Sequence, residues 1–227
     1  MTTSAPIVDC RTDAAAGGHS SASRGSAPYY QDRYATIYHA RCETILPSLP
    51  TPELLLTDPP YPDYHEALYG YHANVLEPMR ELPCRQLIFW TAKQDFPLDY
   101  TAIHIWDKMI GCGSMYERIF ERNGERNWRV YRAVSPNNSV RASQCRDVVT
   151  GHPSQKPLKL IRALIQRCKP RSVCDPYMGT GVVLLASKEA EIPCVGVEAN
   201  ERWCEIAARR LSQEYLAFAQ NIPVIKP

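Results

Sequence analysis

Residues 172–186 read SVCDPYMGTGVVLLA, which predicts a short buried strand, a turn with two glycines and an apolar helix. Strand–turn–helix units of this kind build α/β folds, in which ligands bind beyond the carboxyl ends of the strands. Gly179 and Gly181 let a ligand approach the backbone, and the start of the helix offers free N–H groups. Only two glycines are present, so this is not the G-x-G-x-x-G dinucleotide pattern. Asp175 suits a cationic group such as an α-ammonium instead.

A second acid follows the next predicted strand, at 193–197. Glu198 comes 23 residues after Asp175, near the spacing of about 20 residues at which the acid of a dinucleotide fold binds ribose hydroxyls. The spacing favours the same role for Glu198, and a solvated acid at a strand end is the alternative.

In residues 54–61, LLLTDPPY, an apolar strand ends at an acid, two prolines and a tyrosine. We call this strand end and the glycine turn after residue 174 the two corners. Prolines fix φ and lack an N–H, and Pro60 helps to fix the shape of this turn. Carbonyl oxygens in the turn can therefore accept hydrogen bonds from a ligand. The Asp58 carboxylate and the Pro59 carbonyl would hold the two hydrogens of an amine on a planar base, with Tyr61 stacked on its ring. The alternative is an Asp that caps the next helix.

Residues 152–157, HPSQKP, open a predicted helix at 157–168. Pro157 suits the first position of a helix. We expect Ser154 and Lys156 to lie beside the Asp175 turn, where they would bind a carboxylate. The alternative is a proline-rich linker that caps the helix.

Strand and helix patterns alternate from Tyr34 onward, which predicts a mainly parallel sheet with helices on both faces. Residues 1–28 are rich in Ala, Ser, Gly and Thr, so we expect a disordered arm before a single domain at 29–227. The other predicted helices are 63–79, 181–190 and 201–217. The predicted strands are 34–38, 53–57, 86–90, 102–106, 115–120, 172–174 and 193–197.

Residues 121–151 interrupt this alternation and are rich in arginine. From Arg118 to Arg146, seven arginines against two glutamates leave +5, in a chain of net charge +2. Because the planar guanidinium group of arginine can form paired hydrogen bonds with a phosphate, we expect this stretch to be a short basic insert that contacts DNA. A solvated loop is the alternative. The expected DNA-binding residues are Arg122, Arg126, Arg129, Arg132 and Arg141.

Composition excludes several other classes of protein. Hydrophobic residues make up 44% of the chain and charged residues 22%, an ordinary globular balance. Nine cysteines include no C-x-x-C pair, which favours reduced thiols in a cytoplasmic protein and no metal site. No apolar run approaches the about 20 residues of a membrane span, and the N-terminus lacks the pattern of a signal peptide.

Together the four segments resemble the DNA amino-methyltransferases whose motifs follow the β-class order. In that family an Asp-Pro-Pro-Tyr motif comes first, and a His-Pro-Thr-Gln-Lys-Pro-like stretch and Asp-Pro-Phe-x-Gly-Ser-Gly follow. Residues 152–157 differ from that stretch by one Thr-to-Ser change, and residues 175–181 differ from the last motif at Tyr177 and Thr180.

The resemblance implies a Rossmann-like methyltransferase fold, with a mainly parallel seven-stranded sheet that has one antiparallel strand. It also implies that the two corners line one cleft and that S-adenosylmethionine is the cofactor. The residues implied to act on the target base are Asp58, Pro59, Pro60 and Tyr61. Those implied to bind the cofactor are Asp175, Pro176, Tyr177, Gly179, Gly181 and Glu198, with Ser154 and Lys156 near its methionine end.

The implied reaction is methylation of adenine N6 in DNA, on a base flipped out of the duplex. Asp rather than Ser at the head of the first motif favours adenine N6 over cytosine N4. An RNA adenine or protein glutamine methyltransferase and a DNA-binding relative without catalysis are further alternatives. Residues 63–72 would close over the base or begin a helix that packs on the core. DNA is the expected partner, and a homodimer is a further expectation.

Two departures from the family pattern affect the predicted site. Members often carry an acid after the first strand, whereas residues 39–42 read HARC and the first carboxylate is that of Glu43. The region that reads the target sequence is usually larger than the stretch of about 30 residues available here. We therefore expect short or relaxed specificity, or a partner subunit that supplies it.

Overall fold

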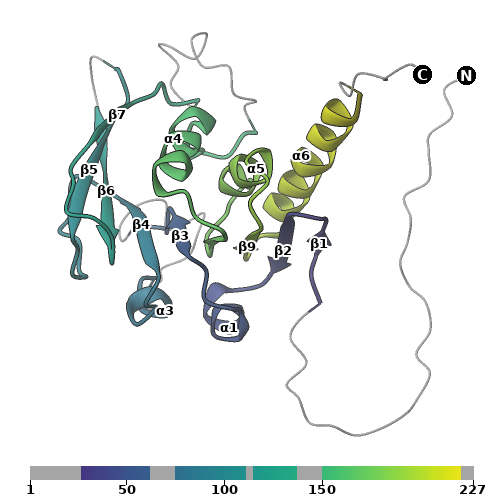
Figure 1. The fold of residues 1–227 in the computed structure, drawn as a ribbon, viewed down its shortest axis with the longest axis horizontal. Helices are drawn as coiled ribbons and strands as arrows, with labels where there is room; N and C mark the ends of the chain where they lie inside the picture. Colours follow the sequence, from purple (N-terminus) through teal and green to yellow (C-terminus); the bar gives the residue numbers. More distant parts are fainter. Residues whose placement is uncertain (1–26, 62–74, 111–114, 137–149, 221–227) are drawn as a thin grey trace, which may run out of the picture.

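The structure, a computed structural model, describes residues 27–61, 75–110, 115–136 and 150–220. A nine-stranded sheet forms its centre, with helices on both faces (Figure 1). The strands are β1 (Tyr30–Gln31), β2 (Ala35–His39), β3 (Leu54–Thr57), β4 (Arg85–Trp90), β5 (Ala102–Asp107), β6 (Tyr116–Arg122), β7 (Val130–Arg132), β8 (Val173–Asp175) and β9 (Cys194–Glu198). The helical segments are α1 (Cys42–Ile45), η1 (Leu46–Ser48), α3 (Glu77–Arg80), α4 (Leu158–Cys168), α5 (Val182–Glu189) and α6 (Glu201–Gln220).

The strands follow the order β1-β2-β9-β8-β3-β4-β6-β5-β7. Neighbours from β2 to β4 are parallel, and β6 is inserted antiparallel between β4 and β5. The mainly parallel sheet is therefore confirmed, but it has nine strands rather than seven, and β1 is a second antiparallel strand. The sequence does not reveal β1 or β7 because two or three residues are too few to show an alternating pattern.

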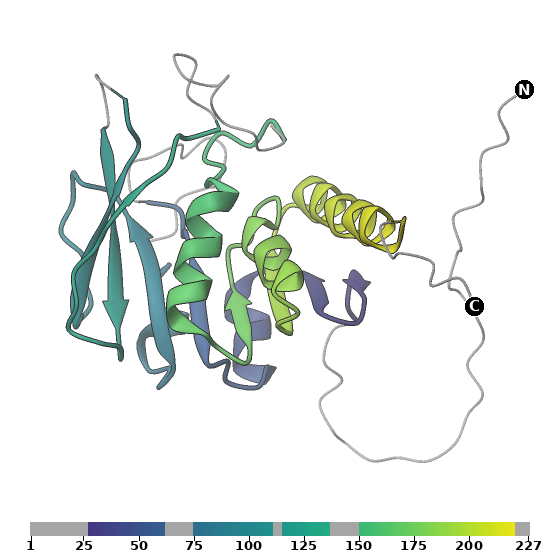
Figure 2. The ribbon, with the colours of Figure 1, turned by 45° about the horizontal axis from the view of Figure 1, so that its top comes forward.

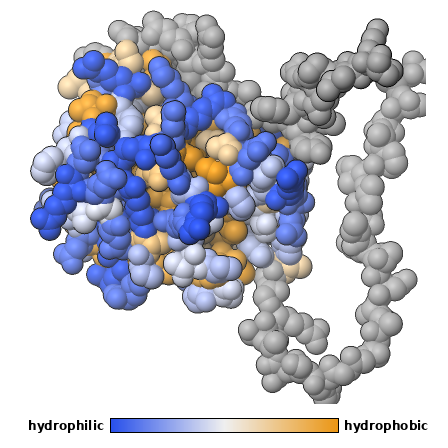
Figure 3. Space-filling view, in the orientation of Figure 1, coloured by the Kyte–Doolittle hydropathy of each residue, from blue (hydrophilic) through white to orange (hydrophobic). Residues whose placement is uncertain are grey.

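Helices α4, α5 and α6 cover one face of the sheet, and α1 and α3 lie on the other (Figure 1 and Figure 2). On β3, Leu54 and Leu56 join the core under α4 and α5, while Leu55 joins the core under α3. Successive strand residues point to opposite faces, so this run of leucines buries both sides of the sheet. Figure 3 shows hydrophilic side chains over much of one outer face, with apolar side chains between them.

Three of the four predicted helices are confirmed, because 157–168, 181–190 and 201–217 correspond to α4, α5 and α6. Most of the predicted helix 63–79, with the expected closing segment 63–72, lies outside the described residues, as does almost all of the expected arm 1–28. The cysteines that the structure describes are all free. No helix in the described ranges is long and apolar enough to cross a bilayer.

A buried ion cluster ties the sheet to α4 near the amino ends of β4 and β5. Glu121 on β6 is fully buried, and its carboxylate lies 2.6 Å from Arg85 and 2.7 Å from His104. Arg167 of α4 contacts the same carboxylate. Burial would raise the pKa of Glu121, but hydrogen bonds from His104 and Arg167 hold it at about 2.

We expect Glu121→Gln to lower the free energy of unfolding by about 3–5 kcal/mol at pH 7, because two mostly buried guanidinium groups lose their carboxylate. A carboxylate whose pKa is lower in the folded state stabilises the protein above its unfolded pKa, and this effect disappears as the pH falls toward 2. The difference between variant and wild type should therefore shrink from about pH 5 downward. Urea unfolding at a series of pH values measures it.

The matched control is Glu205→Gln, which breaks an exposed ion pair with Arg209 on α6. Such pairs contribute about 0–1 kcal/mol, so its stability should stay near that of the wild type. Equal losses in the two variants would contradict the anchoring role of Glu121.

Candidate active site

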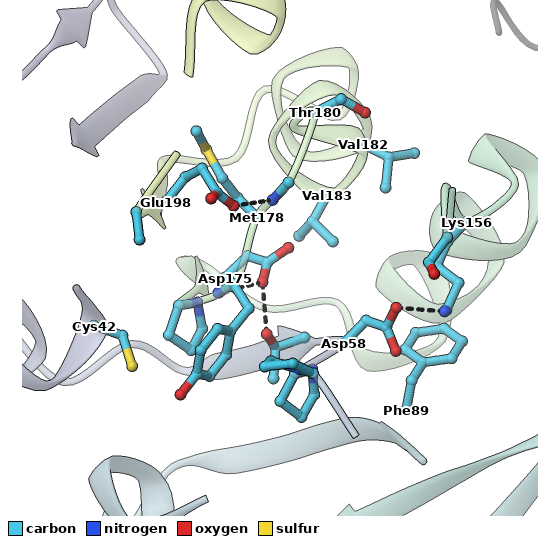
Figure 4. Close-up of a pocket in the computed structure, with 18 of the residues that line it drawn as sticks. Cys42, Asp58, Phe89, Lys156, Asp175, Met178, Thr180, Val182, Val183 and Glu198 are labelled. Carbon is cyan, nitrogen blue, oxygen red and sulfur yellow. Dashed lines mark hydrogen bonds and ion pairs between the residues drawn. The ribbon is translucent and has the colours of Figure 1, made fainter. Parts of the chain in front are cut away.

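The two corners predicted from sequence meet in one pocket. Strands β3 and β8 are parallel neighbours, with Leu54 opposite Val173, so the residues that follow them lie at the same edge of the sheet. At that edge the Thr57 hydroxyl donates a hydrogen bond of 2.6 Å to Asp175 Oδ1 (Figure 4). The prediction that the Asp58 corner and the glycine corner share a cleft is confirmed.

The pocket is lined by the segments that follow β2, β3, β8 and β9 and by the segment that precedes α4. The four strands are parallel, and open α/β sheets bind ligands at this edge, beyond the carboxyl ends of their strands. The lining residues that were predicted from sequence are Asp58, Pro59, Pro60, Tyr61, Ser154, Lys156, Asp175, Pro176, Tyr177, Gly179 and Glu198.

The glycine turn joins β8 to α5 in a conformation that favours glycine at two positions. Gly179 has φ +51° and Gly181 has φ +75°, both in the left-handed region. A Cβ on Gly181 would lie 2.9 Å from the Cβ of Ala207 on α6. Gly181 therefore allows α6 to pack closely, and its predicted contact with a ligand stays a prediction.

Asp175 is buried in the pocket between Asp58 and Glu198 (Figure 4). Burial raises its pKa to about 7, against the effect of hydrogen bonds from Thr57 and from the Tyr177 N–H at 3.1 Å. A cationic ligand would favour the ionised form that burial disfavours. This site therefore suits an ammonium group.

Glu198 at the end of β9 lies on the other side of the glycine turn. Its Oε2 accepts a hydrogen bond of 3.0 Å from the Gly179 N–H, and its Oε1 accepts one of 2.8 Å from the Asn200 N–H. Burial raises the pKa of Glu198, and these backbone donors oppose the rise. Each carboxylate oxygen has a second lone pair, so two hydroxyl groups of a ligand can bind here.

Asp58 follows β3 directly, and both of its carboxylate oxygens have partners. The Tyr61 hydroxyl donates a hydrogen bond of 2.5 Å to Oδ1, and the Tyr61 ring meets Trp90 edge-on with centroids 5.4 Å apart. The Lys156 ammonium contacts Oδ2 (Figure 4). Pro59 and Pro60 complete this side of the pocket. The stacking of Tyr61 on a base stays a prediction.

The position of Lys156 corrects its predicted role beside the Asp175 turn. Its ammonium contacts Asp58 and lies 3.1 Å from Glu117 Oε2, so it is paired with two carboxylates rather than placed to bind the carboxylate of a ligand. Sequence reasoning missed Glu117, because an acid within a strand carries no motif signal. Ser154 lines the pocket, and its part in binding stays a prediction.

Comparison with known proteins shows the family to which the chain belongs. A sequence model of the N6/N4 family described as "DNA methylase" matches residues 83–209, more than half of the chain. The chain belongs to this DNA methylase family. The Type II methyltransferase M.ScaI from Streptomyces caespitosus is 24% identical over 175 residues, which are 74% of this chain and 56% of M.ScaI. The chain thus spans little more than half the length of this relative.

Solved structures share the fold of this chain. TTHA0409 from Thermus thermophilus, a putative DNA modification methylase complexed with S-adenosyl-L-methionine, aligns with a TM-score of 0.54 and 19% identity over 80% of this chain and 95% of its own. The cytosine-N4-specific PvuII DNA methyltransferase aligns with a TM-score of 0.60 and 13% identity over 82% of this chain and 89% of its own. The predicted Rossmann-like methyltransferase fold is confirmed.

Arg122 does not fit its predicted role in DNA binding. Its guanidinium donates to three backbone carbonyls, at 2.8 Å, 3.0 Å and 3.3 Å, and to Gln86 Oε1 at 2.9 Å. Arg122 also pairs with the second residue of β4, at the opposite edge of the sheet from Asp58. We therefore assign it to the packing of this edge.

Three other arginines of the same stretch lie on the surface, and one of them, Arg132, forms an exposed ion pair of 3.4 Å with Asp107. Arg126 and Arg129 precede β7 and Arg132 ends it, and all three are exposed. The neighbouring Trp128 is also exposed. Arg141 lies outside the described residues. Contact between these three arginines and DNA stays a prediction.

Members of the family often carry an acid after the first strand, and in this structure Glu43 brings an acid to that side of the pocket. Glu43 on α1 lines the pocket, and its carboxylate accepts a hydrogen bond of 3.0 Å from Arg41. On the same side the Tyr177 hydroxyl donates to the Val75 carbonyl at 2.8 Å. Tyr177 therefore forms part of the pocket wall, and Glu43 is an additional candidate for ligand contact.

Proposed function

We propose that this protein is a DNA adenine-N6 methyltransferase that uses S-adenosylmethionine. The observation that carries the proposal is one pocket in which two kinds of subsite adjoin. An acid followed by a proline carbonyl, Asp58 and Pro59, suits an amine on a base. A buried acid, a glycine turn and a second acid suit the cofactor. Membership of the DNA methylase family supports the same reaction.

The residues present fit S-adenosylmethionine. When bound, this cofactor supplies a methyl group on a positively charged sulfur, which is a good leaving group. Asp175 would bind its α-ammonium, because the pKa of this buried acid favours a cationic partner. Glu198 would accept hydrogen bonds from both ribose hydroxyls, and Gly179 would let the ligand approach the turn.

Asp58 and Pro59 would activate the target nitrogen. The Asp58 carboxylate and the Pro59 carbonyl accept hydrogen bonds from the two N–H groups of the amine, which draws the nitrogen toward a tetrahedral shape and frees its lone pair. The base must leave the duplex to reach this pocket. Positioning and hydrogen bonding by these residues would account for most of the acceleration.

Adenine N6 is favoured as the target because Asp heads the Asp-Pro-Pro-Tyr motif. Cytosine N4 is the second candidate, since the PvuII enzyme with the same fold is cytosine-N4-specific. Mass spectrometry of nucleosides from unmethylated bacterial DNA, incubated with the protein and S-adenosylmethionine, decides between them. We expect N6-methyldeoxyadenosine. N4-methyldeoxycytidine would select the second candidate, and methylation confined to an RNA sample would overturn both.

The exposed arginines give a further prediction for DNA binding. Replacing Arg126, Arg129 and Arg132 together by glutamine should flatten the slope of log affinity against log salt by up to about 3, because each phosphate contact contributes about 0.9. Fluorescence anisotropy with a DNA duplex at several salt concentrations measures the slope.

The control for this experiment removes three other exposed arginines, Arg162, Arg171 and Arg209, each of which pairs with a glutamate. Their replacement should leave the slope unchanged. If both triple variants bind DNA with the slope of the wild type, Arg126, Arg129 and Arg132 are solvated surface charges that do not contact DNA.

A further inference from the structure

Four buried or half-buried charges of alternating sign run from the pocket along the same end of the sheet, and we call them the charge chain: Asp58, Lys156, Glu117 and Lys108. The Lys156 ammonium contacts Asp58 Oδ2 and lies 3.1 Å from Glu117 Oε2. The Lys108 ammonium lies 2.7 Å from Glu117 Oε1. The four residues come from four separate segments of the chain, so only the folded protein brings them together.

Two aromatic rings hold the Lys156 ammonium from another side. Its Nζ lies 5.1 Å from the centroid of Phe89 and 5.8 Å from that of Trp106. Its side chain is only 6% exposed. An ammonium between two carboxylates and two ring faces has little room to move and little water to solvate it. Its place beside Asp58 is therefore fixed by the surrounding structure.

The Lys156 ammonium of the charge chain opposes the effect of burial on the pKa of Asp58. Burial raises the pKa of Asp58, the Lys156 ammonium lowers it, and the Glu117 carboxylate raises it again. A protonated Asp58 would present an O–H donor where an amine needs an acceptor. Lys156 therefore counters both the burial of Asp58 and the repulsion from Glu117.

Glu117 keeps Lys156 charged and in place. Burial would raise the pKa of Glu117, but Lys156 and Lys108 lower it, so Glu117 stays an anion. Burial would likewise lower the pKa of Lys156, and Asp58 and Glu117 raise it. The two lysines and two carboxylates sum to zero charge, which suits a buried cluster.

The other titratable groups near Asp58 do not replace this cation. The Tyr61 hydroxyl donates to Asp58 but carries no charge. Asp175, reached through Thr57, is an acid and cannot offset a carboxylate. Burial, and to a smaller extent the positive charge of Lys156, lower the pKa of His152 to about 4, so its ring is neutral near pH 7.

We propose that Lys156 is a positioning residue that holds Asp58 as an oriented anion, with Glu117 and Lys108 anchoring its ammonium. This inference rests on the proposed function for the role of Asp58. It differs from cofactor binding by Lys156 in a measurable way. A cofactor ligand would set the affinity for S-adenosylmethionine, whereas a partner of Asp58 sets the pH at which Asp58 becomes an acceptor.

The first test measures the ionisation of Asp58 directly. In protein labelled with [4-¹³C]aspartate, the Asp58 carboxyl resonance is assigned by its loss in Asp58→Asn and is then titrated. In Lys156→Gln its midpoint should rise by about 1–3 pH units, the usual effect of losing an adjacent opposite charge. Lys156→Arg should restore a midpoint near that of the wild type, because it restores the cation.

The double variant Lys156→Gln with Glu117→Gln tests the role of Glu117. It also avoids a buried Glu117 carboxylate that has lost its ion pair with Lys156. It should titrate at lower pH than Lys156→Gln alone, because the repelling carboxylate is gone. The acidic limb of the pH profile for kcat should move in the same order. The affinity for S-adenosylmethionine, measured by calorimetry, should change by less than about threefold in all variants.

The outcomes separate this inference from the proposed function. An unchanged titration of Asp58 in Lys156→Gln overturns the inference, as does a loss of cofactor affinity above about tenfold without a shift in the titration. A shifted titration in a protein that methylates no nucleic acid overturns the proposed function and, with it, the role of Lys156 in positioning an amine acceptor.

Discussion

Replacing Asp58 by alanine should lower kcat for methyl transfer by about 1,000-fold or more. The carboxylate is one of only two acceptors assigned to the target amine, so its loss leaves the amine with the Pro59 carbonyl alone. Asp58 is not assigned to the cofactor, so the affinity for S-adenosylmethionine should stay within about threefold of the wild type. Single-turnover transfer of a labelled methyl group and calorimetry give the two values separately.

Two comparison variants make this result specific. Asp95→Ala removes an exposed acid in the segment after β4 and should leave transfer unchanged. Asp58→Asn keeps one acceptor oxygen and loses the charge, so its rate should fall between those of the wild type and the alanine variant. Transfer by Asp58→Ala within about tenfold of the wild type would remove Asp58 from the reaction.

The second large effect is expected at Asp175. Asp175→Asn should weaken binding of S-adenosylmethionine by about 10- to 150-fold, the range for one hydrogen bond to a charged group, because the α-ammonium loses its anionic partner. The turn itself should persist, since asparagine can still accept the bonds from Thr57 and the Tyr177 N–H. Calorimetry at pH 8 measures the loss.

The pKa of Asp175 adds a pH dependence to the same measurement. Without cofactor this pKa is about 7, chiefly because the group is buried. A cationic ligand binds the ionised form, so the affinity should fall as the pH is lowered through about 7, and binding below that pH should release a proton. In Asp175→Asn the affinity should depend little on pH over this range.

Thr57→Val is the matched variant, because it removes the hydroxyl that donates to Asp175 and leaves the carboxylate in place. This hydrogen bond lowers the pKa of Asp175, so its loss should move the pH dependence of cofactor affinity to higher pH. An affinity for S-adenosylmethionine that is the same in wild type and Asp175→Asn at every pH would remove Asp175 from the cofactor site.

The sequence predicts the parts of this site that depend on where strands end. Thr57 and Asp175 close two apolar strands, and parallel neighbours bring their ends to one edge, so both corners of the pocket could be predicted. The positions of Glu198 and Gly179 follow from the same rule. These predictions need only the direction and order of strands, which the alternation of strand and helix patterns and the family's motif order indicate.

The contacts of long side chains could not be predicted in this way. Lys156 stands two residues from Ser154 in the chain, but its ammonium contacts Asp58 and Glu117, which are both far away in sequence. Arg122 looks like a surface charge in the sequence, yet its guanidinium donates hydrogen bonds to the half-buried Met79 carbonyl and to Gln86 Oε1. Counting charge along a chain does not show which groups the fold will bury.

The central claim is that one pocket holds the cofactor and the target amine side by side. A crystal structure of the protein with S-adenosylhomocysteine tests it most directly. We predict that the α-ammonium of this ligand lies on Asp175, its ribose hydroxyls lie on Glu198 and its sulfur faces Asp58. Ligand density elsewhere, or a sulfur turned away from Asp58, would contradict the account.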